Sequence, residues 1–261
     1  MLFGAERAGA VMRVRAIKTH KVTKDRDLCA ILDRYLTSFD EGSILAITSK
    51  IVSICQGRMV RVEEADKQAL IESEADYWLP PSASKYHVSL TIKDHLLIPM
   101  AGVDESNGNG YYVLWPRDPQ WVANEVRPYL SGRSSCGQVG VIITDSKTTP
   151  LRWGVTGVAI AHSGFLALND YIGQPDIFGR PLQMNKVHIA DALAAAAVLV
   201  MGEGSEQTPL AVIGDLPFVT FQERDPSPEE LRGQWIDIED DLYAPLLKGV
   251  AWRKGRKQPV L

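Results

Sequence analysis

The stretch from Val139 to Gly164 constrains the fold of this chain more than any other. It begins with Val139–Ile143, an apolar run that is too short for a helix and rich in β-branched residues, which predicts a buried strand. Asp145 and Ser146 follow at the expected end of that strand, and three glycines then allow sharp turns or close backbone approach. This combination predicts a metal or phosphate site; the alternative is that Asp145 only caps a turn.

Composition and charge narrow the class of protein. The chain has 261 residues, enough for two domains, and 45% of them are apolar. A net charge of -4 gives no reason to expect nucleic-acid binding, and no apolar run reaches membrane-spanning length. The N-terminal residues lack a long apolar core, so we expect a short disordered lead-in rather than a signal peptide, and a cytoplasmic protein without membrane partners.

Hydrophobic periodicity predicts a mixture of strands and helices without an internal repeat. The helix expected at 186–201 is apolar nearly all round, which predicts deep burial. The grouped carboxylates Glu72, Glu74 and Asp76 indicate a solvated face. Strands are expected at 12–17, 43–54, 111–115 and 209–213, with two further short strands within 88–100 on either side of Lys93 and Asp94. Helices are expected at 28–36, 63–78, 121–130 and 186–201.

Three separated segments each present an acidic residue on a loop beside a buried element: Asp104, Asp145 and Glu203. Carboxylates of this kind suit Mg²⁺ or Mn²⁺ in nucleotide chemistry, where the cation neutralises polyphosphate charge. Ser49 and Lys50 interrupt an apolar run with a hydroxyl and an ammonium, so they are candidate phosphate contacts. The sequence contains no GxxxxGK[ST], which excludes a P-loop.

Six segments, which keep the order and spacing of the family, resemble the coenzyme F420-0:L-glutamate ligase family, also called gamma-glutamyl ligases. GVDESN, TDS, AIAHSG, DIFGR and MGEG together form a specific signature. The segments are TSKIVSICQGR (48–58), AGVDESN (101–107), VGVIITDS (139–146), RWGVTGVAIAHSG (152–164), LNDYIGQPDIFGRPL (168–182) and ADALAAAAVLVMGEG (190–204).

The resemblance implies a fold and an assembly. The fold would be α+β, a two-domain gamma-glutamyl ligase fold with mixed sheets, in an intertwined homodimer whose subunits share the site. The family region would cover 14–220, with a second subdomain inserted at about 85–185. A charged C-terminal extension, 221–261, lies outside the match.

The resemblance also implies a GTP-dependent ligase that joins L-glutamate through an amide bond to a carboxylate acceptor, releasing GDP and phosphate. Two divalent cations, Mg²⁺ or Mn²⁺, would take part, with K⁺ as activator. Asp104 and Asp145 would bind one cation, and Ser146 and Glu203 the second; no catalytic residue is assigned beyond these ligands. The implied nucleotide contacts are Ser49, Lys50, Asn107, Met201, Gly202, Gly204 and Ser205, with a poorer match at 19–22.

Several residues depart from the family pattern, and these departures affect which acceptor the protein is expected to bind. Ile54 and Gln56 replace a lysine and a glutamate, Thr148 and Thr149 replace a Gly-Arg pair, and Trp153 replaces an arginine. Fewer cationic side chains would weaken binding of a phosphorylated acceptor. We therefore expect weak activity on the deazaflavin and better activity on another carboxylate acceptor, such as a pterin-glutamate. The alternatives are therefore the same chemistry on a folate-type acceptor, or a non-catalytic nucleotide- or metabolite-binding homologue.

Overall fold

The computed structural model describes residues 11–23, 27–134 and 136–256. The expected N-terminal lead-in and the end of the basic tail lie outside these ranges. The described residues form a five-stranded sheet, here called the main sheet, in the order β1-β12-β2-β8-β9. Its strands are β1 (Arg13–Ile17), β12 (Leu210–Gly214), β2 (Ser43–Thr48), β8 (Val139–Thr148) and β9 (Val155–Ser163).

The main sheet is buried on both faces where its central strands are apolar, over residues 44–47 of β2 and 139–143 of β8. These two strands run parallel, with Thr48 at the carboxyl end of β2 opposite Thr144 in the middle of β8, while the other neighbours are antiparallel. Side chains alternate between faces along a strand. Accordingly Ile44 of β2 packs against helix α5 (Ile189–Met201), whereas Leu45 packs against helix α4 (Pro119–Ser134).

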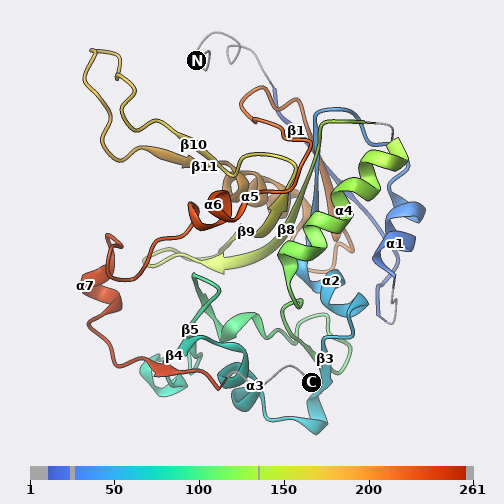
Figure 1. Cartoon of the computed structure of the whole chain (residues 1–261). Helices are drawn as coiled ribbons and strands as arrows, with labels where there is room; N and C mark the ends of the chain where they lie inside the picture. The colour runs from blue at the N-terminus through green and yellow to red at the C-terminus, as the bar shows by residue number, and fades with distance from the viewer. Residues whose placement is uncertain (1–10, 24–26, 135, 257–261) are drawn as a thin grey trace.

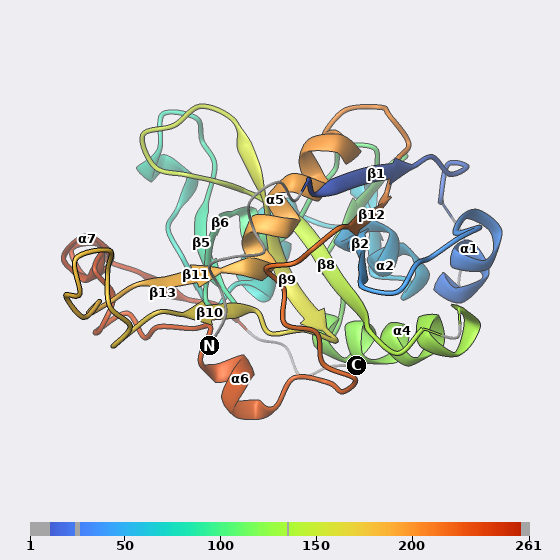
Figure 2. The same cartoon turned by 90° about the horizontal axis from the view of Figure 1, so that it is seen from above.

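Helices on opposite faces complete this packing, as Figures 1 and 2 show. Helices α1 (Leu28–Tyr35) and α4 cover one face, and α5 covers the other. The prediction of a deeply buried helix over 186–201 is partly wrong. Residues 186–188 form strand β11, which pairs with β10 (Leu168–Asp170), and Leu199 is 82% exposed because it lies on the side of α5 away from the sheet.

A smaller unit, residues 59–115, lies below the main sheet in Figure 1 and has a core of its own. Three of its strands, β4 (Tyr77–Trp78), β5 (Leu90–Lys93) and β6 (Leu96–Pro99), form a small sheet with β13 (Arg253–Lys254). Strands β3 (Met59–Arg61) and β7 (Tyr111–Val113) pair separately, and helix α3 (Lys67–Glu74) packs beside them. Short 3₁₀ turns occur at Val62–Glu64, Pro81–Ala83 and Met100–Gly102.

Glu74, expected on a solvated face, instead lies in an ion network of the small unit. Its carboxylate accepts from Arg58 Nη2 at 2.6 Å and from Lys93 Nζ at 2.9 Å, and its side chain is 14% exposed. A charged stretch of sequence does not reveal such partners, because they come from β5 and from the turn before β3.

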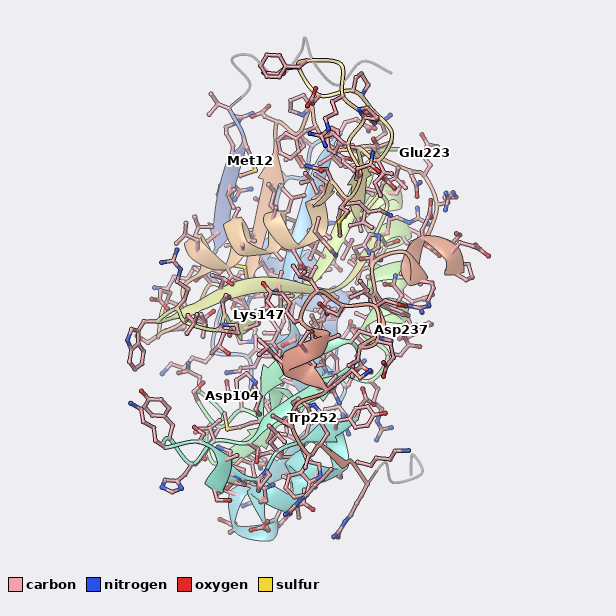
Figure 3. All side chains as sticks on the ribbon, turned by 90° about the vertical axis from the view of Figure 1, so that its left-hand side faces the viewer. Met12, Asp104, Lys147, Glu223, Asp237 and Trp252 are labelled. Carbon is pink, nitrogen blue, oxygen red and sulfur yellow. The ribbon has the colours of Figure 1, made fainter. Side chains whose placement is uncertain are left out.

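The C-terminal extension packs along one side of the molecule. Figure 3 shows it running from Glu223, beside the main sheet, past Asp237 to Trp252 near the small unit. Asp225 binds Arg127 of α4 at 2.9 Å, and β13 then pairs with β4. The extension contains the short helices α6 (Pro228–Arg232) and α7 (Ala244–Leu247). It therefore contacts both the main sheet's helical layer and the small sheet.

The predicted α+β class with mixed sheets is confirmed. The strand expected over 43–54 is wrong in part, because β2 ends at Thr48 and helix α2 (Ser49–Cys55) begins at the next residue. The division into subdomains and the dimer stay predictions. The insertion at about 85–185 also stays a prediction; strands β8 and β9, which fall within that range, belong to the main sheet. Within the described residues, no helix is long and apolar enough to cross a membrane.

Candidate active site

Asp145 is placed by the central pair of strands. Strand β8 does not end at Ile143, as expected, but continues to Thr148 because β9 pairs with it along this length. The register shifts between Ile143 and Thr144, and β-bulges of this kind often redirect side chains near functional sites. The carboxylate of Asp145 accepts from the Ser146 backbone N–H at 2.7 Å and from the indole Nε1–H of Trp115.

Ser49 and Lys50 open helix α2 at the carboxyl end of β2. Because β2 and β8 are parallel neighbours in register, the first turn of α2 lies beside Asp145. The Ser49 side chain lies close enough to the Asp145 carboxylate to oppose the rise in its pKa. The predicted phosphate contacts and the predicted metal ligand thus lie together at the end of the main sheet where β2 terminates.

Asp104 comes from the small unit, just before β7. Lys50 Nζ donates to Asp104 Oδ2 at 2.6 Å and to the Ser106 carbonyl oxygen at 2.7 Å. Ser106 in turn donates to Asp104 through its backbone N–H at 2.8 Å and its hydroxyl at 2.7 Å. The Lys50 side chain therefore joins the main sheet to this loop.

Glu203 lies on the loop between α5 and β12. Gly202 ends α5 at a φ of 78°, a conformation that suits glycine, and Gly204 N–H is bonded to Glu206 at 2.9 Å. Asn107 Nδ2 donates to the Gly204 carbonyl oxygen at 2.9 Å, so the loop is tied to the segment that carries Asp104. The Ser146 side chain lies close enough to the Glu203 carboxylate to oppose the rise in its pKa.

All of the predicted site residues line the same cavity, which has a volume of about 740 Å³. The segment of the poorer match, 19–22, also lines it, including His20, whose ring stacks on Tyr35. Residues that sequence reasoning missed include Trp115 and Thr144, which looked like ordinary strand residues. The predicted residues on the wall are Ser49, Lys50, Asp104, Asn107, Asp145, Ser146, Met201, Gly202, Glu203, Gly204 and Ser205.

The carboxylates of the cavity differ in proton affinity. Burial raises the pKa of Asp145 to about 6, and the hydrogen bonds from Ser146, Trp115 and Ser49 only partly oppose it. Burial also raises the pKa of Glu203. Asp104 differs because its bonds to the Lys50 ammonium and Ser106 outweigh burial and lower its pKa.

The donor set fits divalent cations that prefer oxygen. Carboxylate and hydroxyl oxygens come from Asp104, Asp145, Ser146 and Glu203 around one cavity, which suits Mg²⁺ or Mn²⁺. In the described part of the chain, no three Asp, Glu, His or Cys side chains are arranged to hold a single ion. Two protein ligands per ion remain compatible with Mg²⁺, which usually takes its other ligands from water and phosphate.

The departures from the family pattern occupy different environments. Ile54 is buried and lines the cavity, so an apolar side chain stands where the pattern has lysine. Gln56 binds the backbone of Arg117 at 2.7 Å and 3.0 Å, which is a structural contact. Trp153 lies at the tip of the β8–β9 hairpin, 91% exposed, edge-on to Tyr86.

Comparison with known proteins matches residues 16–215 to the profile of the family described as F420-0:Gamma-glutamyl ligase. A coenzyme F420:L-glutamate ligase of Methanopyrus kandleri is 33% identical over 222 residues, covering 78% of this chain and 87% of that protein. The enzymes of the same name from Archaeoglobus fulgidus and Methanococcus maripaludis are each 34% identical; the matches cover 74% of this chain in both cases, and 83% and 77% of those proteins.

Proposed function

Because this chain belongs to the F420-0:gamma-glutamyl ligase family, we propose that it is a ligase that joins L-glutamate through an amide bond to a carboxylate acceptor, using GTP and divalent cations. One observation carries the proposal. Segments far apart in the sequence place three carboxylates, two hydroxyls and the Lys50 ammonium on the wall of one cavity. An F420-type deazaflavin is the acceptor suggested by the relatives' names.

The proposed reaction has two steps. An oxygen of the acceptor carboxylate attacks the γ-phosphorus of GTP, and the bond to GDP breaks. The glutamate amine then attacks the carbonyl carbon of the acyl phosphate, an amide forms, and phosphate leaves while the amine loses a proton. Phosphoryl transfer of this kind depends on positioning and on stabilising negative charge.

Several residues of the chain would serve these steps. Asp104 and Asp145 would hold one divalent cation, and Ser146 and Glu203 a second, with K⁺ as activator. When bound, such cations neutralise polyphosphate charge and polarise the phosphoryl group. Lys50 would contact the phosphates with Ser49, while Asn107 would fix the loop of Met201, Gly202, Gly204 and Ser205 against the nucleotide; its bond to the Gly204 carbonyl oxygen supports that role.

A homodimer in the cytoplasm is part of the proposal. The arm formed by β10, β11 and their connection projects away from the rest of the chain in Figure 1. Its connection exposes Ile177 at 91%, Phe178 at 88% and Met184 at 81%, and apolar surface of this kind is typical of a protein interface. Light scattering should give about twice the chain mass of 28.8 kDa.

The test is an assay of glutamate incorporation with GTP or ATP and Mn²⁺. Product is detected by mass spectrometry with either the deazaflavin or a pterin-glutamate as acceptor. Turnover of either acceptor supports the ligase, and their ratio decides the predicted preference that Ile54 motivates. Tight GTP binding without turnover of any carboxylate acceptor would instead support the non-catalytic homologue. The retained carboxylates favour the ligase over that alternative.

A further inference from the structure

Trp115 connects the small unit to the cavity carboxylate of the main sheet. It follows strand β7, is 3% exposed, and lines the cavity beside Asp145. Its indole Nε1–H donates to Asp145 Oδ2. This bond crosses from one unit to the other, so the position of the Asp145 carboxylate depends on a side chain from outside the strand that carries it.

The indole is held firmly from the side of the small unit. Gly102 has a φ of 73°, and a Cβ at this position would lie 2.1 Å from the indole Nε1, so only glycine leaves room for the ring. The Trp115 carbonyl oxygen accepts from Arg58 Nε at 3.1 Å. Lys93 Nζ lies 5.7 Å from the ring centroid, within the range of a cation–π contact. Contacts other than the bond to Asp145 therefore already hold the ring in place.

The bond determines which way the carboxylate faces. Asp145 Oδ1 accepts from the Ser146 backbone N–H, and Oδ2 accepts from Trp115, so each oxygen has its own directional donor. A carboxylate has about four acceptor sites, and these bonds leave lone pairs for a cation on the cavity side. Donors around a ligating carboxylate orient it and contribute to metal affinity.

We propose that Trp115 is a positioning residue, which holds the Asp145 carboxylate in the orientation that binds a divalent cation. The inference deepens the proposed function and rests on it, because it takes Asp145 as a metal ligand. Loss of a donor of this type commonly weakens metal binding by roughly 10–100-fold. In this proposal the indole N–H, rather than the bulk of the ring, orients the carboxylate.

The experiment compares Mn²⁺ binding by the full-length protein and its variants, measured as free Mn²⁺ by electron paramagnetic resonance. Replacing Trp115 with β-(3-benzothienyl)alanine exchanges the N–H for sulfur and keeps the shape of the ring. Trp115→Phe is the genetically simpler variant. Trp121→Phe is the matched control, since Trp121 is 56% exposed on α4 and does not line the cavity. Asp145→Asn serves as the reference for a lost ligand.

We expect the benzothienyl variant to bind Mn²⁺ roughly tenfold more weakly at an unchanged melting temperature, and Trp121→Phe to match the wild type. Bound Mn²⁺ should also quench tryptophan fluorescence in the wild type more than in Trp115→Phe. Wild-type affinity in the benzothienyl variant, with loss of binding in Asp145→Asn, would overturn the positioning role and leave the proposed metal site standing. A wild type that binds no Mn²⁺ would overturn both.

Discussion

The two sides of the cavity hold their carboxylates in opposite ways. On the main-sheet side, Asp145 receives bonds from neutral donors, and burial raises its pKa to about 6. On the small-unit side, Asp104 is paired with Lys50, and its pKa is lowered. A carboxylate kept at a high pKa gains most from an incoming cation, whereas a carboxylate that already has one must exchange it. The comparison thus favours a fixed half, Asp145, and an exchangeable half, Asp104, in the proposed cation site.

The difference extends to what supports each side. Asp145 follows Val141, Ile142 and Ile143, which are fully buried between apolar layers. The small unit has a smaller core and relies on ion pairs of Glu74 with Arg58 and Lys93. Ion pairs are weakened by added salt and by protonation of the carboxylate, whereas apolar side chains carry no charge that salt can screen. The two regions should therefore respond differently to substitution and to solution conditions.

The largest expected effect follows from removing the charge on the fixed side. Asp145→Asn should abolish metal-dependent turnover, because an amide is a poor ligand for a divalent cation, and should leave the fold intact. Turnover is measured by glutamate incorporation and folding by circular dichroism. Asp240→Asn, in the exposed acidic patch of the extension, is the matched control. Substantial turnover by Asp145→Asn would remove this residue from the site.

Acidification should separate the two regions next. His162 of β9 is buried, and burial lowers its pKa to about 4 from an ordinary value of 6.5. The unfolded chain therefore binds more protons at this position between these values, so His162 alone lowers the free energy of unfolding by up to about 3 kcal/mol as the pH drops from about 6.5 to 4, whereas Asp145, with its pKa raised to about 6, acts in the opposite direction. Urea denaturation at several pH values isolates the His162 contribution as a difference between two proteins, since His162→Gln should gain stability relative to the wild type as the pH falls.

The small unit should respond to acid later. The pKa of Glu74 is lowered from 4.5 because Lys93 and Arg58 outweigh the effect of burial. A lowered carboxyl pKa stabilises the fold above the unfolded value, and this stabilisation is lost only as the pH falls through the lower folded value. Hydrogen exchange should thus show β9 loosening at a higher pH than β5. Simultaneous loss in both strands would contradict the separation.

Removing the Lys50 ammonium, the cation that pairs with Asp104, should weaken nucleotide binding. Lys50→Met deletes an ammonium that bonds Asp104 and, in the proposed site, the phosphates of GTP. A charge-assisted hydrogen bond contributes about 1.5–3 kcal/mol, so we expect KM for GTP to rise roughly 10–100-fold. Steady-state kinetics measures this, with Lys248→Met on the C-terminal extension as control. An unchanged KM would exclude Lys50 from the phosphates.

The smallest effect tests how the extension supports the small unit. A Cβ at Gly255 would lie 1.7 Å from the Ala75 carbonyl oxygen, so Gly255→Ala should displace β13 from β4. We expect a loss of about 1–2 kcal/mol in the free energy of unfolding, seen also as faster hydrogen exchange in β4. Gly132→Ala on α4 is the matched control, since nothing lies within 4 Å of its Cβ. That control should be neutral or stabilising by up to about 1 kcal/mol.

Parts of this picture were predictable from sequence because they depend on local patterns. The β-branched run at Val139 predicted β8, and Asp104, Asp145 and Glu203 were singled out because each stands next to a buried element. Local patterns fail where a distant partner decides. Strand β8 extends past Asp145 only because β9 pairs with it, and α2 begins at Ser49 where a strand was expected.

Long-range contacts account for the rest of the misses. No local pattern joins Trp115 to Asp145, which is 30 positions away, because the bond exists only once the small unit packs against the main sheet. Similarly, the run around Glu74 has the composition of a solvated face, yet Arg58 and Lys93 enclose that side chain. Exposure of Leu199 also escaped prediction, since a helix apolar on all sides does not reveal which side remains uncovered.

The most direct test of the central claim, that the two sides bind a cation together, is a double-mutant cycle on Mn²⁺ affinity. Wild type, Asp104→Asn, Asp145→Asn and the double variant are titrated with Mn²⁺ under electron paramagnetic resonance detection. We predict that each single substitution removes the tightest Mn²⁺ site and that the double variant loses little more, since both carboxylates serve one ion. Retention of that site in Asp104→Asn, with its loss in Asp145→Asn, would contradict the claim.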